Sequence, residues 1–172
     1  FQTGRSPGFR FTPGHYTRVG LSGADGNLVW RPFSVVSAAY DPYLEFVATL
    51  VQGGQFSDLL AGIRAGAAMH VDKSSYGFLT IDHFAPGEDL WLLASGTGLG
   101  LFVSILRDPA TLAAFRTVVV VHSVRHAREL AHLELLCGRV AEDDRQEVEE
   151  AVGDRVEHLV GAVARKRGNE ED

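Results

Sequence analysis

Apolar and β-branched stretches alternate with turn-forming residues along the first 82 positions. These stretches are Tyr16–Leu21, Leu28–Val36, Leu44–Val51, Met69–Val71 and Gly77–Ile81. Pairs such as Pro13-Gly14, Asp25-Gly26 and Gly53-Gly54 separate them, as expected between strands. Strands at such short spacing are typical of a barrel or a sandwich.

One helix interrupts this series of strands. Ser57 is a suitable N-cap, and the apolar residues Leu59, Leu60 and Ile63 follow at helical spacing. We expect the helix to start at Ser57 and to end at Gly66.

The pattern changes after Pro86-Gly87. Leu90–Ala94 is a continuous apolar run, typical of a strand buried on both faces. A glycine-rich turn and a helix-like stretch over Leu99–Leu106 follow it, and Thr117–His122 predicts a second buried strand. Together with a helix over Ala127–Leu136, this order predicts an incomplete parallel α/β sheet. We therefore expect a β domain over residues 1–85 and an α/β domain over residues 86–172.

The last 30 residues allow two interpretations. Glu142–Val152 is a plausible helix, and valines at helical spacing could continue it as far as Val163. Gly153 and Gly161 weaken that continuation. We prefer a third strand over Val156–Val163.

Composition and charge exclude several classes of protein. The 172 residues carry a net charge of −6, all of it from residues 141–172, because residues 1–140 are neutral on the formal count. A neutral body argues against nucleic acid as the main partner, since phosphate binding needs a basic face. The longest uncharged run, Leu90–Leu106, is shorter than the roughly 20 residues of a membrane span. The single cysteine, Cys137, excludes an intramolecular disulfide framework and favours a cytoplasmic location, and we expect no metal site.

The strand segment Arg31-Pro32-Phe33-Ser34 is the first candidate for ligand binding. An arginine can bind phosphate through its planar fork of donors, an aromatic ring can lie against a flat ring, and a serine can hydrogen-bond a ring heteroatom. The alternative is an ordinary strand with one surface arginine.

Two glycine-rich segments add possible phosphate sites. Gly53-Gly54-Gln55-Phe56-Ser57 stands at a helix start, where backbone N–H groups can bind an anion, although a helix cap after a tight turn is the commoner interpretation. Gly96-Thr97-Gly98-Leu99-Gly100 lies between an apolar strand and a helix, where glycines let a dinucleotide's pyrophosphate approach. By itself that motif is weak.

Taken together, these blocks resemble the bacterial branch of the ferredoxin (flavodoxin)–NADP reductase family. The resemblance runs from about Phe9 to Leu136. Its blocks are Pro7–Phe11 with Gly14, Arg31–Ser34 with Ser37-Ala38, Leu44–Phe46, Gly54 with Ser57, Pro86-Gly87, Leu92-Leu93 before Gly96–Gly98, Phe102 with Ser104-Ile105, and His122 with Arg125, Glu129-Leu130 and Leu133.

The resemblance implies an FAD-binding β-barrel joined to an NADP-binding α/β domain. The residues that it assigns to FAD are Arg31, Pro32, Phe33, Ser34, Ala48, Gln55, Phe56, Ser57 and Thr97. Those that it assigns to NADP are Gly96, Gly98, Val124, Arg125, Ala164 and Arg165, the last at the 2′-phosphate. Because the flavin supplies the chemistry, no catalytic side chain is implied; Ser34 and Thr97 would lie nearest the reacting rings.

Departures from the family pattern leave two functions open. Phe33 replaces a tyrosine, Leu101 replaces a proline, and alanines replace both threonines before Arg165. Relative to the family, the chain looks truncated at both ends, and an exposed edge strand would then favour self-association. We expect an oxidoreductase that passes electrons between NADPH and ferredoxin or flavodoxin through FAD. The alternative is a divergent paralogue that binds flavin without efficient NADPH turnover.

Overall fold

The computed structural model describes residues 1–124, 126 and 160–165. Its first half contains two antiparallel sheets. Strand β1 (Gln2–Gly4) pairs with β4 (Tyr43–Glu45), and β2 (Tyr16–Ser22) lies between β3 (Leu28–Ser34) and β5 (His70–Val71). Both sheets enclose one hydrophobic core, which contains Phe9, Val19, Leu21, Val29, Val35, Leu44, Phe46 and Phe56. The structure thus contains the strands expected at Tyr16–Leu21 and Leu28–Val36, and shorter ones where we expected Leu44–Val51 and Met69–Val71.

The strand expected at Gly77–Ile81 is absent from the described residues. Tyr76 makes a single bridge to Tyr16, and the chain then continues into a short 3₁₀ helix, η1 (Ile81–His83). Gly77 has a φ of +130°, which L side chains rarely adopt, and Phe78 is 83% exposed. The apolar run therefore forms a connection between the halves, and the expected strand was wrong.

Helix α1 (Gln55–Gly62) begins two residues earlier than predicted, with Gly54 as its N-cap. Ser57 lies inside the first turn, and its hydroxyl oxygen accepts a hydrogen bond from the Val51 N–H at 3.0 Å. The Ser57 hydroxyl group therefore accepts a hydrogen bond from the loop that precedes α1, and it does not cap the first turn of the helix.

The second half begins with the strand–turn–helix unit that the sequence predicts. Strand β6 (Asp89–Ser95) leads into a 3₁₀ turn, η2 (Gly96–Gly98), and helix α2 (Leu99–Leu106). A further short helix, α3 (Pro109–Ala114), precedes β7 (Thr117–Ser123), which pairs with β6 in parallel. The N-cap of α3 is Asp108, whose carboxylate accepts a hydrogen bond from the Ala110 N–H, and proline follows at the first helical position.

Strand β6 is buried on one face rather than on both, which corrects the expectation for Leu90–Ala94. Leu90, Leu92 and Ala94 belong to the same core as α2. Trp91 and Leu93 point to the opposite face and are 63% and 67% exposed. An apolar run predicts a buried strand, but the number of covered faces depends on what packs against the sheet.

A third strand is present, in part where it was expected. Strand β8 (Val160–Arg165) pairs with β7 in antiparallel orientation, so that Val160 lies opposite His122 and Arg165 opposite Thr117. We expected this strand to run parallel to the other two. Apolar residues do not encode the direction of a strand, because direction depends on the connection that leads into it. The predicted helices over Ala127–Leu136 and Glu142–Val152 lie outside the described residues.

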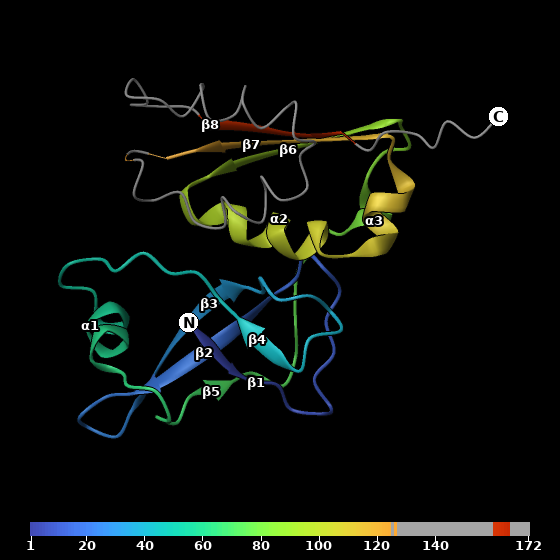
Figure 1. Ribbon diagram of the computed structural model, residues 1–172. Helices are drawn as coiled ribbons and strands as arrows, with labels where there is room; N and C mark the ends of the chain where they lie inside the picture. Colours follow the sequence, from blue (N-terminus) through green and yellow to red (C-terminus); the bar gives the residue numbers. More distant parts are fainter. Residues whose placement is uncertain (125, 127–159, 166–172) are drawn as a thin grey trace.

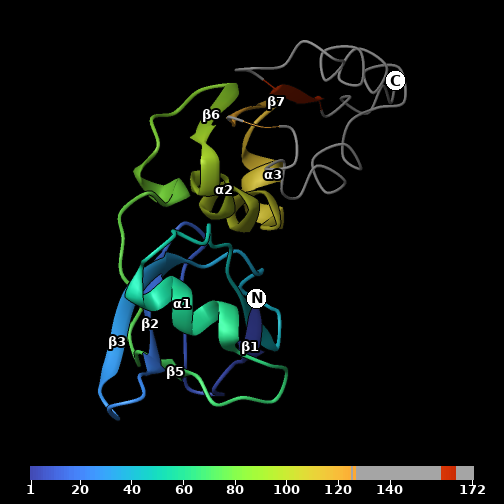
Figure 2. The same cartoon turned by 90° about the vertical axis from the view of Figure 1, so that its left-hand side faces the viewer.

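Helix α2 lies between the sheet of the second half and the strands of the first (Figures 1 and 2). Its core includes Val36, which comes from the first half of the chain, and Val47 packs against that core. In the part of the chain that the structure describes, no helix is long and apolar enough to cross a membrane.

Candidate functional site

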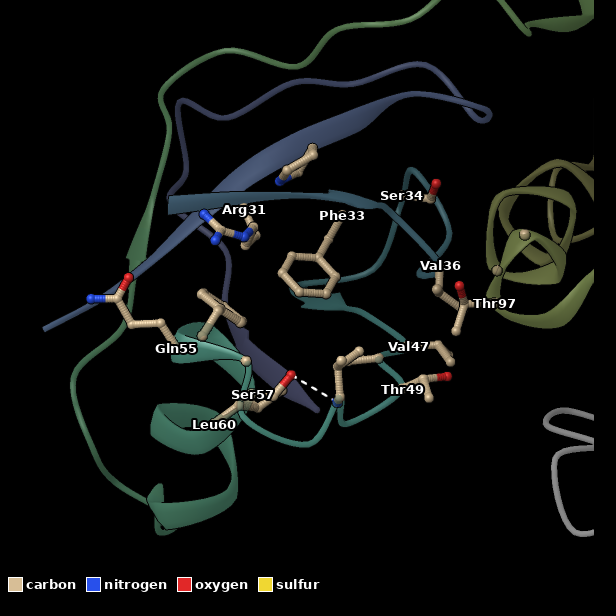
Figure 3. Close-up of a pocket in the computed structure, with 17 residues that line it drawn as sticks. Arg31, Phe33, Ser34, Val36, Val47, Thr49, Gln55, Ser57, Leu60 and Thr97 are labelled. Carbon is tan, nitrogen blue, oxygen red and sulfur yellow. Dashed lines mark hydrogen bonds between the residues drawn. The ribbon is translucent and has the colours of Figure 1, made fainter. Parts of the chain in front are cut away.

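A pocket of about 660 Å³ opens where the first half of the chain meets the start of α2. Strand β3, the segment after β4, the start of α1 and the glycine turn before α2 all contribute to its wall (Figure 3). Its lining residues are Arg31, Pro32, Phe33, Ser34, Val36, Val47, Ala48, Thr49, Val51, Gly54, Gln55, Phe56, Ser57, Leu60, Thr97, Gly98 and Gly100. The volume falls within the range of small-molecule sites, roughly 300–1,000 Å³.

All nine residues that the resemblance assigns to FAD line this pocket. They come from four segments of the chain, and the two residues farthest apart in the sequence are Arg31 and Thr97. In Figure 3, Arg31 and Gln55 lie on one side of the pocket, whereas Ser34 and Thr97 lie on the other.

One end of the pocket can bind an anion. Arg31 is exposed, and among the described lining residues it is the only charged side chain. Its Nη1 donates to the neighbouring Trp30 carbonyl at 2.7 Å, which leaves further N–H donors of the guanidinium for a ligand. The start of α1 contributes backbone N–H groups beside Gln55 and Phe56. The Ser57 hydroxyl accepts from Val51 and keeps its own proton to donate.

The middle of the pocket is apolar and aromatic. Phe33 is half-buried, and its ring centroid lies 5.2 Å from that of Phe56 and 6.1 Å from that of Phe46. Phe1 also contacts it edge-on at 5.4 Å. These rings limit the rotamers of Phe33, so one wall offers a preformed surface for a flat, apolar group.

Among the described residues assigned to NADP, only Gly98 lines the pocket. Gly96, two residues before Gly98, has a φ of +52°, and its carbonyl oxygen is 2.8 Å from His122 Nε2. Val124 is buried just beyond the end of β7, and Arg125 lies outside the described residues.

The structure does not bring Ala164 and Arg165 to the glycine turn. Their partners in β7 are Val118 and Thr117, at the end of the sheet opposite Gly96. The assignment of Ala164 and Arg165 to NADP rests on the resemblance alone and stays a prediction.

Sequence reasoning missed several lining residues, all close to residues that it identified. Val36, Val47 and Thr49 flank predicted positions along extended segments, whereas Leu60 lies three residues after Ser57 on the same face of α1. Helical spacing could have identified Leu60. The segment between β4 and α1 is not regular strand, so alternation could not separate Thr49 and Val51 from their neighbours.

No group of histidine, cysteine or carboxylate side chains suited to a metal occurs among the described residues. The pocket therefore combines an anion-binding end, an aromatic wall and the hydroxyl groups of Ser34, Thr49, Ser57 and Thr97. This set of features suits an elongated ligand with phosphate groups and a flat ring system.

Comparisons with known proteins agree with this geometry. No protein-family model matches the chain. The chain is 40% identical to ferredoxin–NADP reductase A of Sorangium cellulosum over 143 residues, which cover 83% of this chain and 51% of that protein. It is 37% identical to the flavodoxin/ferredoxin–NADP reductase of Escherichia coli, covering 78% of this chain and 54% of that protein. The chain thus spans about half the length of the curated relatives it matches.

A solved structure gives the same result. The ferredoxin NADP⁺ reductase of Neisseria gonorrhoeae, crystallised with bound FAD and NADP, superposes with a TM-score of 0.77 at 37% identity. The match covers 81% of this chain and 56% of that one. This likeness supports the predicted fold class, a β-barrel followed by an incomplete α/β domain.

Proposed function

We propose, from the premise that this chain belongs to the ferredoxin (flavodoxin)–NADP reductase family, that it is a flavoprotein oxidoreductase passing electrons between NADPH and ferredoxin or flavodoxin through FAD. One observation carries the proposal: residues from four separate segments line one pocket with a cation at one end and hydroxyl groups at the other. We also propose a division near residue 85, which agrees with the two hydrophobic clusters. The cytoplasm and a ferredoxin-like or flavodoxin-like partner belong to the same proposal.

The residues at the anion-binding end would hold the FAD pyrophosphate. Arg31 can neutralise phosphate charge through two parallel N–H donors. Ser57 can donate its hydroxyl proton, and the backbone N–H groups near Gln55 and Phe56 can donate at the start of α1. Pro32, next to Arg31, has no backbone N–H and keeps this part of the strand rigid.

The other residues would hold and orient the ring system. Phe33 supplies an aromatic surface, Ser34 a hydroxyl group, and Ala48 a small side chain where the backbone passes close to the ligand. When bound, FAD supplies hydride acceptance and single-electron release, which no protein side chain can provide. The role of Thr97, on the facing wall, would be to orient the nicotinamide toward the flavin.

The NADP contacts would lie at the glycine turn and beyond the end of β7. Gly96 and Gly98 let a phosphate approach the start of α2 closely, and Val124 and Arg125 follow the neighbouring strand. For Arg165, the resemblance and the register of β8 predict different results. If Arg165→Ala loses affinity for NADPH but not for NADH, Arg165 binds the 2′-phosphate, as the resemblance implies. If the preference between the two nucleotides is unchanged, Arg165 lies away from the nucleotide, as its position opposite Thr117 predicts.

An absorbance spectrum before and after anaerobic addition of NADPH tests the proposed function. We expect the purified protein to be yellow and to bleach rapidly with NADPH. A colourless protein that cannot take up FAD would contradict flavin binding altogether.

A second candidate function is flavin binding without efficient NADPH turnover. Its support is the uneven placement of the described residues: all nine assigned to FAD line the pocket, whereas Gly98 is the only described residue of the NADP set that does. A yellow protein whose spectrum NADPH leaves unchanged would favour this second function.

A further inference from the structure

One face of α2 is directed at the first half of the chain. Gly100, Ser104 and Arg107 are spaced by four and three residues, which places them on the same side of a helix. Each of them contacts the segment between β3 and β4 or the end of β4. This face, which we call the docking face, therefore joins the two halves.

The first contact of the docking face is steric. A methyl group at Gly100 would lie 2.9 Å from Val36 Cγ2, closer than carbon atoms approach in proteins. Val36 is fully buried, so it has little room to move. The absence of a side chain at Gly100 therefore lets the start of α2 lie against the pocket wall.

The second contact lies one turn later. Ser104 is fully buried, and its hydroxyl group donates to the Ser37 carbonyl at 2.9 Å. A buried hydroxyl needs such a partner, so this bond disfavours sliding of the helix along the segment.

The third contact is an ion pair at the end of the helix. Arg107 Nη1 lies 2.6 Å from a Glu45 carboxylate oxygen and donates to the Val36 carbonyl at 3.0 Å. The two side chains are only 19% and 17% exposed. The hydroxyl group of Tyr40 also donates to the Arg107 carbonyl at 3.3 Å. A pair held this far from solvent is more restrictive than an exposed one.

The same residues lead directly to the pocket. The Val36 N–H donates to the Glu45 carbonyl at 2.9 Å, and Val36 itself lines the pocket. Thr97, just before α2, lies on the facing wall (Figure 3), and Gly98 beside it also lines the pocket. Arg107 thus ties the far end of α2 to the backbone that forms one wall, while the near end of α2 forms the other.

We propose that Arg107 and Glu45 are positioning residues that set the placement of Thr97 relative to Ser34. This inference rests on the proposed function, since Ser34 and Thr97 are the residues assigned to the two reacting rings. Neither Arg107 nor Glu45 lines the pocket, so their effect would pass through the orientation of α2.

Distances between two spin labels, one in each half of the chain, test the orientation of α2 relative to the first half without any cofactor. Spin labels at Asp58→Cys and Ala113→Cys, both exposed, report on the two halves in a Cys137→Ser background. We expect a narrow distance distribution that broadens in Arg107→Met and in Glu45→Gln. Arg107→Lys should keep it narrow, because an ammonium group can donate to both acceptors. As a matched control, Arg116→Met breaks an exposed ion pair with Glu88 and should change nothing.

The rate of flavin reduction by NADPH tests whether this placement matters for function. At saturating NADPH, the rate of flavin reduction should fall about 10- to 100-fold in Arg107→Met, since small misplacements of reacting groups cost that much. The dissociation constant of FAD should change far less. If distances and rates both match the parent protein in Arg107→Met and Glu45→Gln, the inference is overturned. If the parent protein takes up no FAD, the proposed function fails, but the distances still decide the positioning role.

Discussion

His122 Nε2 lies 2.8 Å from the carbonyl oxygen of Gly96, so the end of β7 holds the glycine turn that follows β6. A carbonyl can only accept, which means that Nε2 carries the proton. His122 is 3% exposed and Gly96 has a φ of +52°. A buried histidine therefore stabilises a backbone conformation that few residues other than glycine adopt.

Replacing His122 should loosen this turn. We expect His122→Ala to lower the free energy of unfolding by about 1–3 kcal/mol, because the variant loses a buried hydrogen bond. His122→Gln can still donate from its amide and should recover part of the loss. Chemical denaturation of the three proteins measures the effect. Equal stabilities of His122→Ala and the parent would show that the contact contributes nothing.

Arg31 provides the sharpest test of the anion-binding end. Arg31→Ala should weaken FAD binding about 10- to 100-fold, the cost of losing charge-assisted hydrogen bonds. Arg31→Lys should fall between, since it keeps the charge but not the planar fork. Quenching of FAD fluorescence on titration measures both. The matched control is Arg64→Ala, which removes an exposed arginine outside the pocket; similar losses in the two alanine variants would contradict the assignment.

Gly100→Ala tests the close approach of α2. Alanine favours a helix over glycine by about 1 kcal/mol, but the added methyl group would overpack against Val36, which typically costs about 1–3 kcal/mol. We expect a small net loss of stability. Adding Val36→Ala should make room, so Gly100→Ala should be less harmful in that background. Thermal unfolding of the parent, the two single variants and the double variant completes a double-mutant cycle. If the stability losses of the two single variants simply add up in the double variant, the contact between Gly100 and Val36 is contradicted.

Stability should also depend on pH through His15. Burial lowers the pKa of this side chain below its ordinary value of 6.5, and the nearby Asp82 carboxylate opposes the shift. The unfolded chain therefore binds more protons than the folded one just below pH 6.5, so stability should fall as the pH is lowered through that region. His15→Asn should flatten the curve of melting temperature between pH 7 and 5. His126→Asn, at an exposed position, should not.

The uncovered face of β6 predicts self-association. Trp91 and Leu93 are exposed on it, and within the described ranges no strand pairs with the outer edge of β6. Such an edge and apolar face can pair with another copy. Sedimentation velocity should show a mass that rises with concentration, and Leu93→Lys should reduce the rise. Phe78→Lys, a change at a still more exposed apolar residue outside the sheet, should leave the rise unchanged.

The sequence predicted local features well where one physical signal dominated. The apolar stretch Leu99–Leu106 matches α2 residue for residue, and Thr117–His122 falls within β7. The phosphate-type segments at Arg31, Ser57 and Thr97 could each be noticed separately. That they line one pocket follows from tertiary packing, which no single segment encodes.

Other features depend on contacts between distant residues. The docking of Arg107 on Glu45 joins residues 62 positions apart, and nothing in either local sequence identifies the partner. The exposure of Trp91 and the direction of β8 likewise depend on what lies beside the sheet. Helix α3 was not predicted, although an Asp-Pro pair such as Asp108-Pro109 is a recognisable signal for the start of a helix.

The alternation along β6 has a consequence for spectroscopy. The chain has two tryptophans, and the structure places one in each half: Trp30 on β3, beneath the Arg18 guanidinium, and Trp91 on the open face of β6. Trp30 is half-buried whereas Trp91 already meets solvent, so their emission should differ in wavelength in the folded protein. Single-tryptophan variants would thus reveal, without any attached dye, whether the two halves unfold together or one after the other.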